Sequence, residues 1–374
     1  MAREILEILA SHIKKYPYDQ VSFISCILFS YPLGIVYRRL FHASNVSPQT
    51  RQTVGLAWGV LFGWICFKWQ LFNIIGTTTL CYLLTVYVHP KYTHRVVLVV
   101  SLAILSTSHL MRQIYDYGSY KLDYTGPLMI LVQKVTYIAF SVHDGKDEKE
   151  EDLTPDQKEE QLKEVPRPLE YFGYCLHYTM LLSGPVSTYR QYKDFINGTE
   201  KNKREESNFT PVLRKSLASL ICLVLFLNFS SRFSISRNVD ESFINNQSFV
   251  RRLLYAWISI AILRMQYYFA FKAGEAVNNL CGLGFSGYDK DGNALWDSMA
   301  NVNIFKIEFG LNCKMVLENW NITTVWWLRR TAYDRLTNHR TMGVFVLSAV
   351  WHGFYGGYYL TFFTSQLFVE AFFM

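Results

Sequence analysis

The sequence predicts an all-α protein that crosses a membrane several times. Half of its 374 residues are hydrophobic and only 18% are charged, whereas an average soluble domain carries about 25% charged residues. The apolar residues gather in blocks, and about 20 mostly apolar residues cross a bilayer as a helix. The candidate blocks are residues 21–37, 54–67, 71–88, 96–110, 126–142, 171–186, 217–229, 253–271, 341–355 and 358–374.

Several of these blocks are shorter than a full membrane crossing. Short segments are tolerated in a bilayer only where other helices or a water-filled cavity surround them. We therefore expect some blocks to be re-entrant or buried between longer helices. The blocks follow one another without a break in composition, which favours a single membrane domain over residues 21–374.

Three polar segments interrupt or precede the blocks. Residues 1–20 carry charges among isolated apolar residues, a pattern typical of an amphipathic helix at the membrane surface or of an ordinary cap helix. Residues 144–170 and 194–210 hold dense Lys, Glu and Asp. Charges at that density are too costly for hydrocarbon, so both segments are predicted to be solvated loops.

The net charge of +7 does not indicate a nucleic-acid partner. The basic residues form no stripe and instead flank apolar blocks, as Arg38, Arg39, Arg251 and Arg252 do. Cations in that position hold helix ends at the membrane surface. The seven cysteines have no metal-binding spacing, and we expect no metal ion and no bound cofactor.

One short glycine motif has to be set aside. Gly282, Gly284 and Gly287 match the GxGxxG spacing, but a dinucleotide site needs a preceding strand and a following helix. The flanking sequence predicts a helix first and a polar turn afterwards, so a loop is the better interpretation.

The chemistry-bearing region lies between residues 304 and 364. A polar, aromatic segment contains Trp320, Asn321 and Thr324, and the apolar block that follows contains the sequence Trp351-His352-Gly353. An ionisable residue inside an apolar segment is costly and therefore suggests function. An imidazole, with an ordinary pKa of about 6.5, suits a general base. A structural histidine bonded to a neighbouring helix remains the alternative.

These residues resemble the membrane-bound O-acyltransferase family, and within it the branch that acylates lysophosphatidylethanolamine and lysophosphatidylserine. The resemblance covers roughly residues 20–374, in several blocks of matching order and spacing. They are Asn319-Trp320-Asn321, Trp351-His352-Gly353, Asp123 to Lys134, Val142-His143-Asp144-Gly145, Ser183-Gly184-Pro185, Ala276 to Asn279, Gly284 to Asn293, Trp296-Asp297 and Ile304 to Glu308.

The resemblance implies a bundle of helices around a chamber inside the membrane, with His352 and Asn321 as the catalytic pair. It implies transfer of a fatty acyl chain from acyl-CoA to the free hydroxyl of a lysophospholipid, at sn-2, in the endoplasmic reticulum membrane. Trp320, Thr324 and Trp351 are then expected to bind substrate. Arg329, Arg330 and Arg335 are candidates to bind the CoA phosphates, although anchoring at the membrane surface explains them equally well.

Two departures from the family pattern leave alternatives open. Gly356 stands where the family usually has proline, which loosens the turn after His352. The chain also ends at Met374, where members that resemble it continue, so one wall of the chamber is expected to be missing. An inactive, C-terminally truncated relative, an acyltransferase for proteins or sterols, a transporter and a homo-oligomer all remain open.

Overall fold

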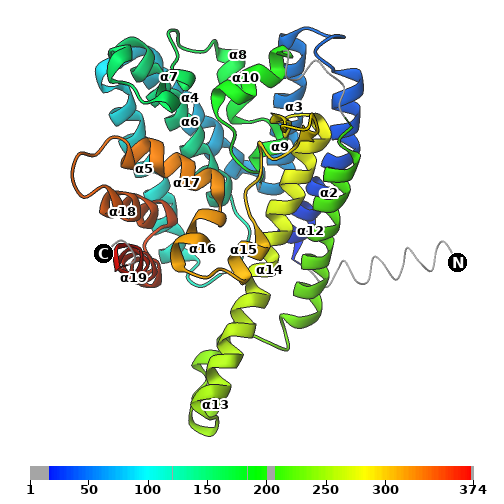
Figure 1. Ribbon diagram of the computed structural model, residues 1–374, viewed down its shortest axis with the longest axis vertical. Helices are drawn as coiled ribbons and strands as arrows, with labels where there is room; N and C mark the ends of the chain where they lie inside the picture. Colours follow the sequence, from blue (N-terminus) through cyan, green and yellow to red (C-terminus); the bar gives the residue numbers. More distant parts are fainter. Residues whose placement is uncertain (1–16, 120, 183, 200–206, 372–374) are drawn as a thin grey trace, which may run out of the picture.

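The computed structural model describes residues 17–119, 121–182, 184–199 and 207–371. Nearly all regular structure is helical (Figure 1). The long helices are α2 (Tyr18–Leu40), α3 (Pro48–Phe67), α4 (Leu71–Tyr87), α5 (Pro90–Tyr115), α6 (Thr125–Lys146), α12 (Phe209–Phe229), α14 (Phe249–Cys281), α18 (Arg340–His352) and α19 (Gly356–Ala371). The all-α prediction is therefore confirmed.

Short elements connect the long helices. The short α-helices are α7 (Pro155–Glu160), α8 (Pro168–Cys175), α9 (Tyr178–Leu181), α10 (Tyr189–Asn197), α13 (Glu241–Asn246), α15 (Ile304–Glu308), α16 (Cys313–Asn319) and α17 (Ile322–Leu328). The 3₁₀ turns are η1 (Lys68–Gln70), η2 (Glu150–Asp152) and η3 (Ile235–Val239), and η4 (Arg329–Tyr333) is a π-helical turn. After α14, β1 (Gly287–Tyr288) pairs antiparallel with β2 (Ala294–Leu295). The glycine motif thus lies in a loop, as predicted, and its last glycine begins a short β-hairpin that was not predicted.

Local sequence signals set many of the helix boundaries. The Ser47 hydroxyl accepts a hydrogen bond from the Thr50 N–H and Pro48 occupies the first position of α3, a favourable start for a helix. Ser248 caps α14 in the same way, and α14 ends at Gly282 with φ 102°. Glycine takes that left-handed conformation without steric cost.

Helix α6 forms the centre of the bundle. In its most apolar stretch 83% of the residues are buried, against 17% in α12. It packs against α4, α5, α8 and α17. A helix buried on nearly all sides can carry polar groups only if neighbouring elements satisfy them, so α6 is placed to organise an internal site.

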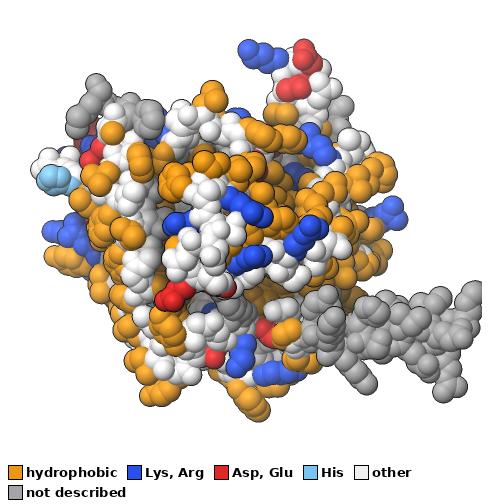
Figure 2. All heavy atoms as spheres, turned by 90° about the horizontal axis from the view of Figure 1, so that it is seen from below, with side chains coloured by type: hydrophobic (Ala, Val, Ile, Leu, Met, Phe, Trp, Pro, Cys, Tyr) orange, Lys and Arg blue, Asp and Glu red, His pale blue; other side chains and the backbone are white. Residues whose placement is uncertain are grey.

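The outer helices expose apolar side chains that suit a lipid environment. Leu28 of α2, Ile221 of α12 and Trp257 of α14 are each more than half exposed. Figure 2 shows hydrophobic side chains around much of the outline of the molecule seen from below. Within the described part, five segments are long and apolar enough to span a membrane, among them the stretch Pro48–Tyr87 that contains α3 and α4.

Nine of the ten predicted apolar blocks correspond to long helices, several of them longer than predicted. Block 253–271 belongs to α14, whose 33 residues measure about 50 Å, more than the hydrocarbon thickness of about 30 Å. Figure 1 shows α12 and α14 side by side, with α13 at their projecting lower end. Block 358–374 corresponds to α19 as far as Ala371.

The prediction for block 171–186 is wrong, because the described part of this segment is two short helices, α8 and α9, with a break between them. The Leu176 carbonyl lies against Gly59 of α3, where a Cβ would approach its oxygen to 1.7 Å. The buried ammonium of Lys134 donates to the carbonyls of Tyr174 and Cys175 at 3.2 and 3.1 Å. Protein groups therefore satisfy the broken backbone, as membrane burial requires.

The two predicted loops begin later than expected. Helix α6 continues to Lys146, and Asp144 on it is buried, while α10 continues to Asn197 with Phe195 and Ile196 buried. The remainder of the first loop includes η2 and α7. Most of the predicted amphipathic segment 1–20 lies outside the described residues.

Candidate active site

Asn321 sits at the start of α17 in a left-handed conformation, with φ 53° and ψ 53°. Asparagine takes this conformation more readily than most residues, and such residues often lie at functional sites. Its carbonyl accepts the N–H groups of Thr324 and Val325 at 2.9 and 3.1 Å. Among the described residues, no hydrogen bond engages its side-chain amide, which leaves the amide available to a ligand.

Asn301 holds the backbone around Asn321 in place. Its carbonyl accepts the Ile322 N–H at 2.8 Å. Its side-chain oxygen accepts from the N–H and the hydroxyl of Thr323, at 3.2 and 2.9 Å. These three bonds fix the first turn of α17 to the loop before α15, so the left-handed residue is supported on its C-terminal side.

A buried carboxylate holds that loop in turn. Glu275 of α14 is fully buried, and its Oε1 accepts the N–H groups of Asn301 and Val302 at 2.9 and 3.2 Å. Lys272 and Lys215 lie 2.9 and 3.5 Å from its Oε2. Sequence reasoning did not identify Asn301 or Glu275 as supports. Glu275 lies just beyond the predicted apolar block 253–271, so that block gave no signal for it.

His352 is the last residue of α18, and aromatic rings surround its imidazole. The ring centroids of Trp351, Tyr358 and Phe362 lie 4.7, 5.6 and 5.1 Å from that of His352. The indole N–H of Trp351 donates to the Met129 carbonyl on α6 at 2.9 Å. The histidine is therefore partly enclosed in an apolar setting that can exclude water.

A second histidine contacts the backbone on either side of His352. The Nε2 atom of His109 on α5 lies 3.2 Å from the carbonyl oxygen of Trp351, and the His109 ring packs against Gly353. Sequence reasoning missed His109, although it is a titratable residue at the end of a predicted membrane segment. It holds the backbone on both sides of His352.

Helices α6, α17 and α18 bring the two candidate catalytic residues onto adjoining elements. The Trp327 and Trp351 ring centroids are 5.8 Å apart, and the Trp327 indole donates to Thr136 of α6 at 2.8 Å. Gln133 of α6 donates to the Thr324 hydroxyl at 2.9 Å. Within the described part no hydrogen bond joins His352 to Asn321.

The predicted substrate residues differ in their surroundings. Thr324 and Trp351 are buried in the junction of α6, α17 and α18. Trp320 packs against Tyr267, Tyr268 and Phe271 of α14 with centroid distances of 5.8 to 5.9 Å. Its ring therefore helps to pack α14 against the segment that carries Asn321.

The three arginines predicted to bind phosphate also differ in their exposure and in their ion pairs. Arg330 is buried and lies 3.7 Å from Asp144 and 3.8 Å from Glu160, while Arg335 lies 2.6 Å from Asp144. Burial raises the pKa of the Glu160 carboxyl, and the Arg330 charge opposes that rise. Arg329 is exposed, with a longer 3.6 Å contact to Asp334, so it is the most accessible of the three.

Among the described residues, one group of side chains has ligand atoms close enough together to hold a metal ion. The ligand atoms of His143, Asp147 and Glu148 lie within 4.8 Å of one another. Both imidazole nitrogens of His143 already have partners, the Pro90 carbonyl at 3.0 Å and Glu148 at 3.1 Å. The group is therefore satisfied as it stands.

Comparison with known proteins identifies the family. Residues 110–374 match the model of the membrane-bound O-acyltransferase family. The chain belongs to this family. It is 40% identical to lysophospholipid acyltransferase 6 of Drosophila melanogaster over 94% of this chain and 51% of the relative. It is 36% identical to membrane-bound glycerophospholipid O-acyltransferase 2 of Gallus gallus over 96% of this chain and 73% of the relative.

A more distant relative covers a similar span. The lysophospholipid acyltransferase of Schizosaccharomyces pombe is 30% identical over 98% of this chain and 73% of the relative. The chain thus spans about half the length of the Drosophila relative and about three quarters of the other two. With its apolar helices, this member of the membrane-bound O-acyltransferase family is a multi-pass membrane protein.

The glycine after His352 in this family member offers a direct test of the turn. Gly353 has φ 111°, and a Cβ there would lie 3.1 Å from the His109 ring. We expect Gly353→Ala to destabilise the turn by about 1–3 kcal/mol, measured as a lower thermal unfolding midpoint of the protein in detergent. Gly356→Ala is the matched control, because a Cβ there meets nothing within 4 Å. Equal thermal midpoints of both variants would contradict the proposed constraint.

Proposed function

We propose that this chain is an acyl-CoA-dependent O-acyltransferase that reacylates lysophospholipids during phospholipid remodelling. The observation that carries the proposal is the placement of His352 and Asn321 on adjoining elements of a family member, one in an aromatic enclosure and the other with an unengaged amide. The names of its relatives supply the substrate class.

His352 acts as the general base in this proposal. A lipid hydroxyl is a weak nucleophile near neutral pH, and a positioned imidazole that removes its proton accelerates attack by about 10²–10⁴-fold. The hydroxyl oxygen forms the new ester bond to the acyl carbonyl carbon. The carbon–sulfur bond of the thioester then breaks, and the departing CoA thiolate takes up the proton from the imidazolium.

Asn321 stabilises the charge that develops on the carbonyl oxygen or orients the attacking hydroxyl. Its amide has no other hydrogen-bond partner among the described residues, and its backbone is fixed through Asn301 and Glu275. A donor that is already in place does not have to reorganise during the reaction, which makes its contribution large. The tryptophan and phenylalanine rings around His352 exclude water that would otherwise hydrolyse the thioester.

The polar head of acyl-CoA is assigned to the surface near Arg329. The exposed guanidinium can bind a phosphate oxygen, whereas Arg330 and Arg335 already neutralise Asp144. We further assign the protein to the endoplasmic reticulum membrane and the acylated position to sn-2, following the family resemblance.

The variant Asn321→Gly tests the role that we propose for the Asn321 side-chain amide. Glycine takes the left-handed conformation freely, so this change removes the side chain without straining the backbone. We expect product formation from labelled oleoyl-CoA and a panel of lysophospholipids to fall by about 10²–10³-fold.

His339→Gly is the matched control for the amide test, because His339 also has a left-handed backbone, with φ 52°, and is exposed. Undiminished transfer in Asn321→Gly would remove the amide from the mechanism. Sterol and peptide acceptors belong in the same panel, since product from either of them alone would replace the lysophospholipid proposal.

A further inference from the structure

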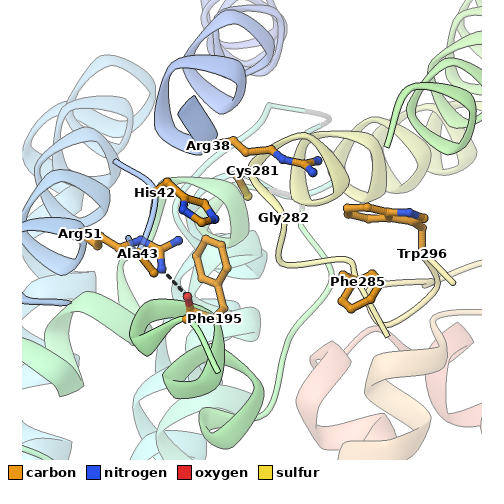
Figure 3. A pocket seen from close by; sticks show the side chains of 10 residues that line it. Arg38, His42, Ala43, Arg51, Phe195, Cys281, Gly282, Phe285 and Trp296 are labelled. Atoms are coloured by element: carbon orange, nitrogen blue, oxygen red, sulfur yellow. Dashed lines mark hydrogen bonds between the residues drawn. The ribbon is translucent and has the colours of Figure 1, made fainter. Parts of the chain in front are cut away.

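A pocket far along the chain from His352 is lined by three basic side chains. It lies where α2 ends, α3 begins and α10 and α14 finish (Figure 3). Arg38, His42 and Arg51 contribute the basic groups, and Phe195, Phe285 and Trp296 contribute aromatic rings. None of the described residues that line it is acidic.

Arg51 carries the strongest evidence, because it is 97% buried and has no carboxylate partner within the described residues. Its Nη1 donates to the carbonyls of Phe195 and Ile196, the latter at 2.8 Å. Its Nε is buried without any hydrogen-bond partner. Carbonyl dipoles compensate a buried cation only in part, and the remainder of the cost calls for an anion.

The aromatic walls keep the cations in place. Arg51 lies over the Phe195 ring at 4.5 Å, and Arg38 lies over the Trp296 ring at 5.3 Å. Figure 3 shows Arg51, His42 and Phe195 grouped on one side of the pocket, with Trp296 and Phe285 on the other. Gly198 packs tightly against Ala43 in the pocket lining, because a Cβ at position 198 would lie 2.2 Å from the Ala43 Cβ.

The position of the pocket indicates a lipid ligand. Arg38 belongs to the last turn of α2, a helix apolar enough to span the membrane. Ile35 and Leu40 on the same part of α2 are 42% and 65% exposed. A phosphate in the pocket would therefore sit at the level of lipid headgroups, beside an apolar surface that acyl chains can follow.

We propose that this pocket binds the phosphate group of a membrane phospholipid, with Arg51 as its buried anchor and Arg38 at its rim. This site is distinct from the proposed catalytic residues. Its occupancy does not depend on acyl transfer, so binding is measured without activity.

The test measures thermal unfolding of the purified full chain in a neutral detergent. The probes are dioctanoyl phosphatidic acid, dioctanoylglycerol as the same lipid without phosphate, inorganic phosphate and CoA. We expect dioctanoyl phosphatidic acid to raise the midpoint temperature of thermal unfolding of the wild-type protein. Arg51→Gln should weaken its apparent affinity at least about tenfold, because a charge-assisted bond to phosphate is lost.

Two further variants keep the test decisive. Arg39→Gln removes the same charge one residue from Arg38 but outside the pocket lining, and it should bind like the wild type. Arg38→Gln should weaken binding even if Arg51→Gln fails to fold. Equal stabilisation by dioctanoylglycerol, by inorganic phosphate or by CoA would overturn the lipid-phosphate assignment. So would the absence of stabilisation, or equal affinity in all variants.

Discussion

Replacing His352 with alanine should abolish acyl transfer while leaving the fold intact. Loss of a positioned general base costs about 10²–10⁴-fold in rate, which is enough to remove detectable product in a membrane assay. The fold should tolerate the change, because in the described part the imidazole makes ring contacts only and anchors no other element. The measurement is product formation from oleoyl-CoA at matched expression, together with the thermal midpoint in detergent.

A second histidine, at the N-terminal end of α18, separates a chemical role from a general effect of histidine loss. His339 precedes α18 at its opposite end and is exposed. His339→Asn should retain activity, because asparagine readily takes its left-handed conformation. Full activity in His352→Ala would contradict the proposed base. A collapse of its thermal midpoint would instead show that the histidine is structural.

The helices were predictable because a bilayer leaves few alternatives to a long apolar helix. The segment 171–186 was mispredicted for a reason that composition cannot show. Its helix breaks where Leu176 meets Gly59 and where Lys134 satisfies two free carbonyls. These partners lie about 40 residues or more away in the sequence. Only the tertiary structure therefore reveals that a helix break is tolerated there.

The catalytic roles of His352 and Asn321 stay predictions, and the structure adds the residues that support them. His352 and Asn321 were identified from a polar residue in an apolar block and from the family resemblance. The residues that hold them, His109, Asn301 and Glu275, come from three distant segments and act through backbone carbonyls and N–H groups. Such bonds leave no local spacing pattern, and Glu275 itself lies beyond the predicted apolar block 253–271.

The free-energy cost of leaving a buried charge unpaired gives the largest expected effect on stability. Glu275→Gln should destabilise the protein by about 3–5 kcal/mol, because removing one member of a buried ion pair leaves the other charges unpaired. Lys215 and Lys272 would then lose their shared carboxylate partner, and the N–H groups of Asn301 and Val302 would lose a charged acceptor. The thermal midpoint in detergent measures the loss.

Two comparisons decide whether the buried charge is the cause. Glu241→Gln, in the exposed first turn of α13, should change stability by no more than about 0.5 kcal/mol. Adding Lys215→Met to Glu275→Gln should recover part of the loss, because the double variant removes one unpaired cation and the two positions are in contact. If the double variant is less stable than Glu275→Gln, the unpaired ammonium is not what destabilises the protein. The carboxylate would then act mainly as the acceptor for the two N–H groups that position α17, and Glu275→Gln would lower acyl transfer more than it lowers the midpoint.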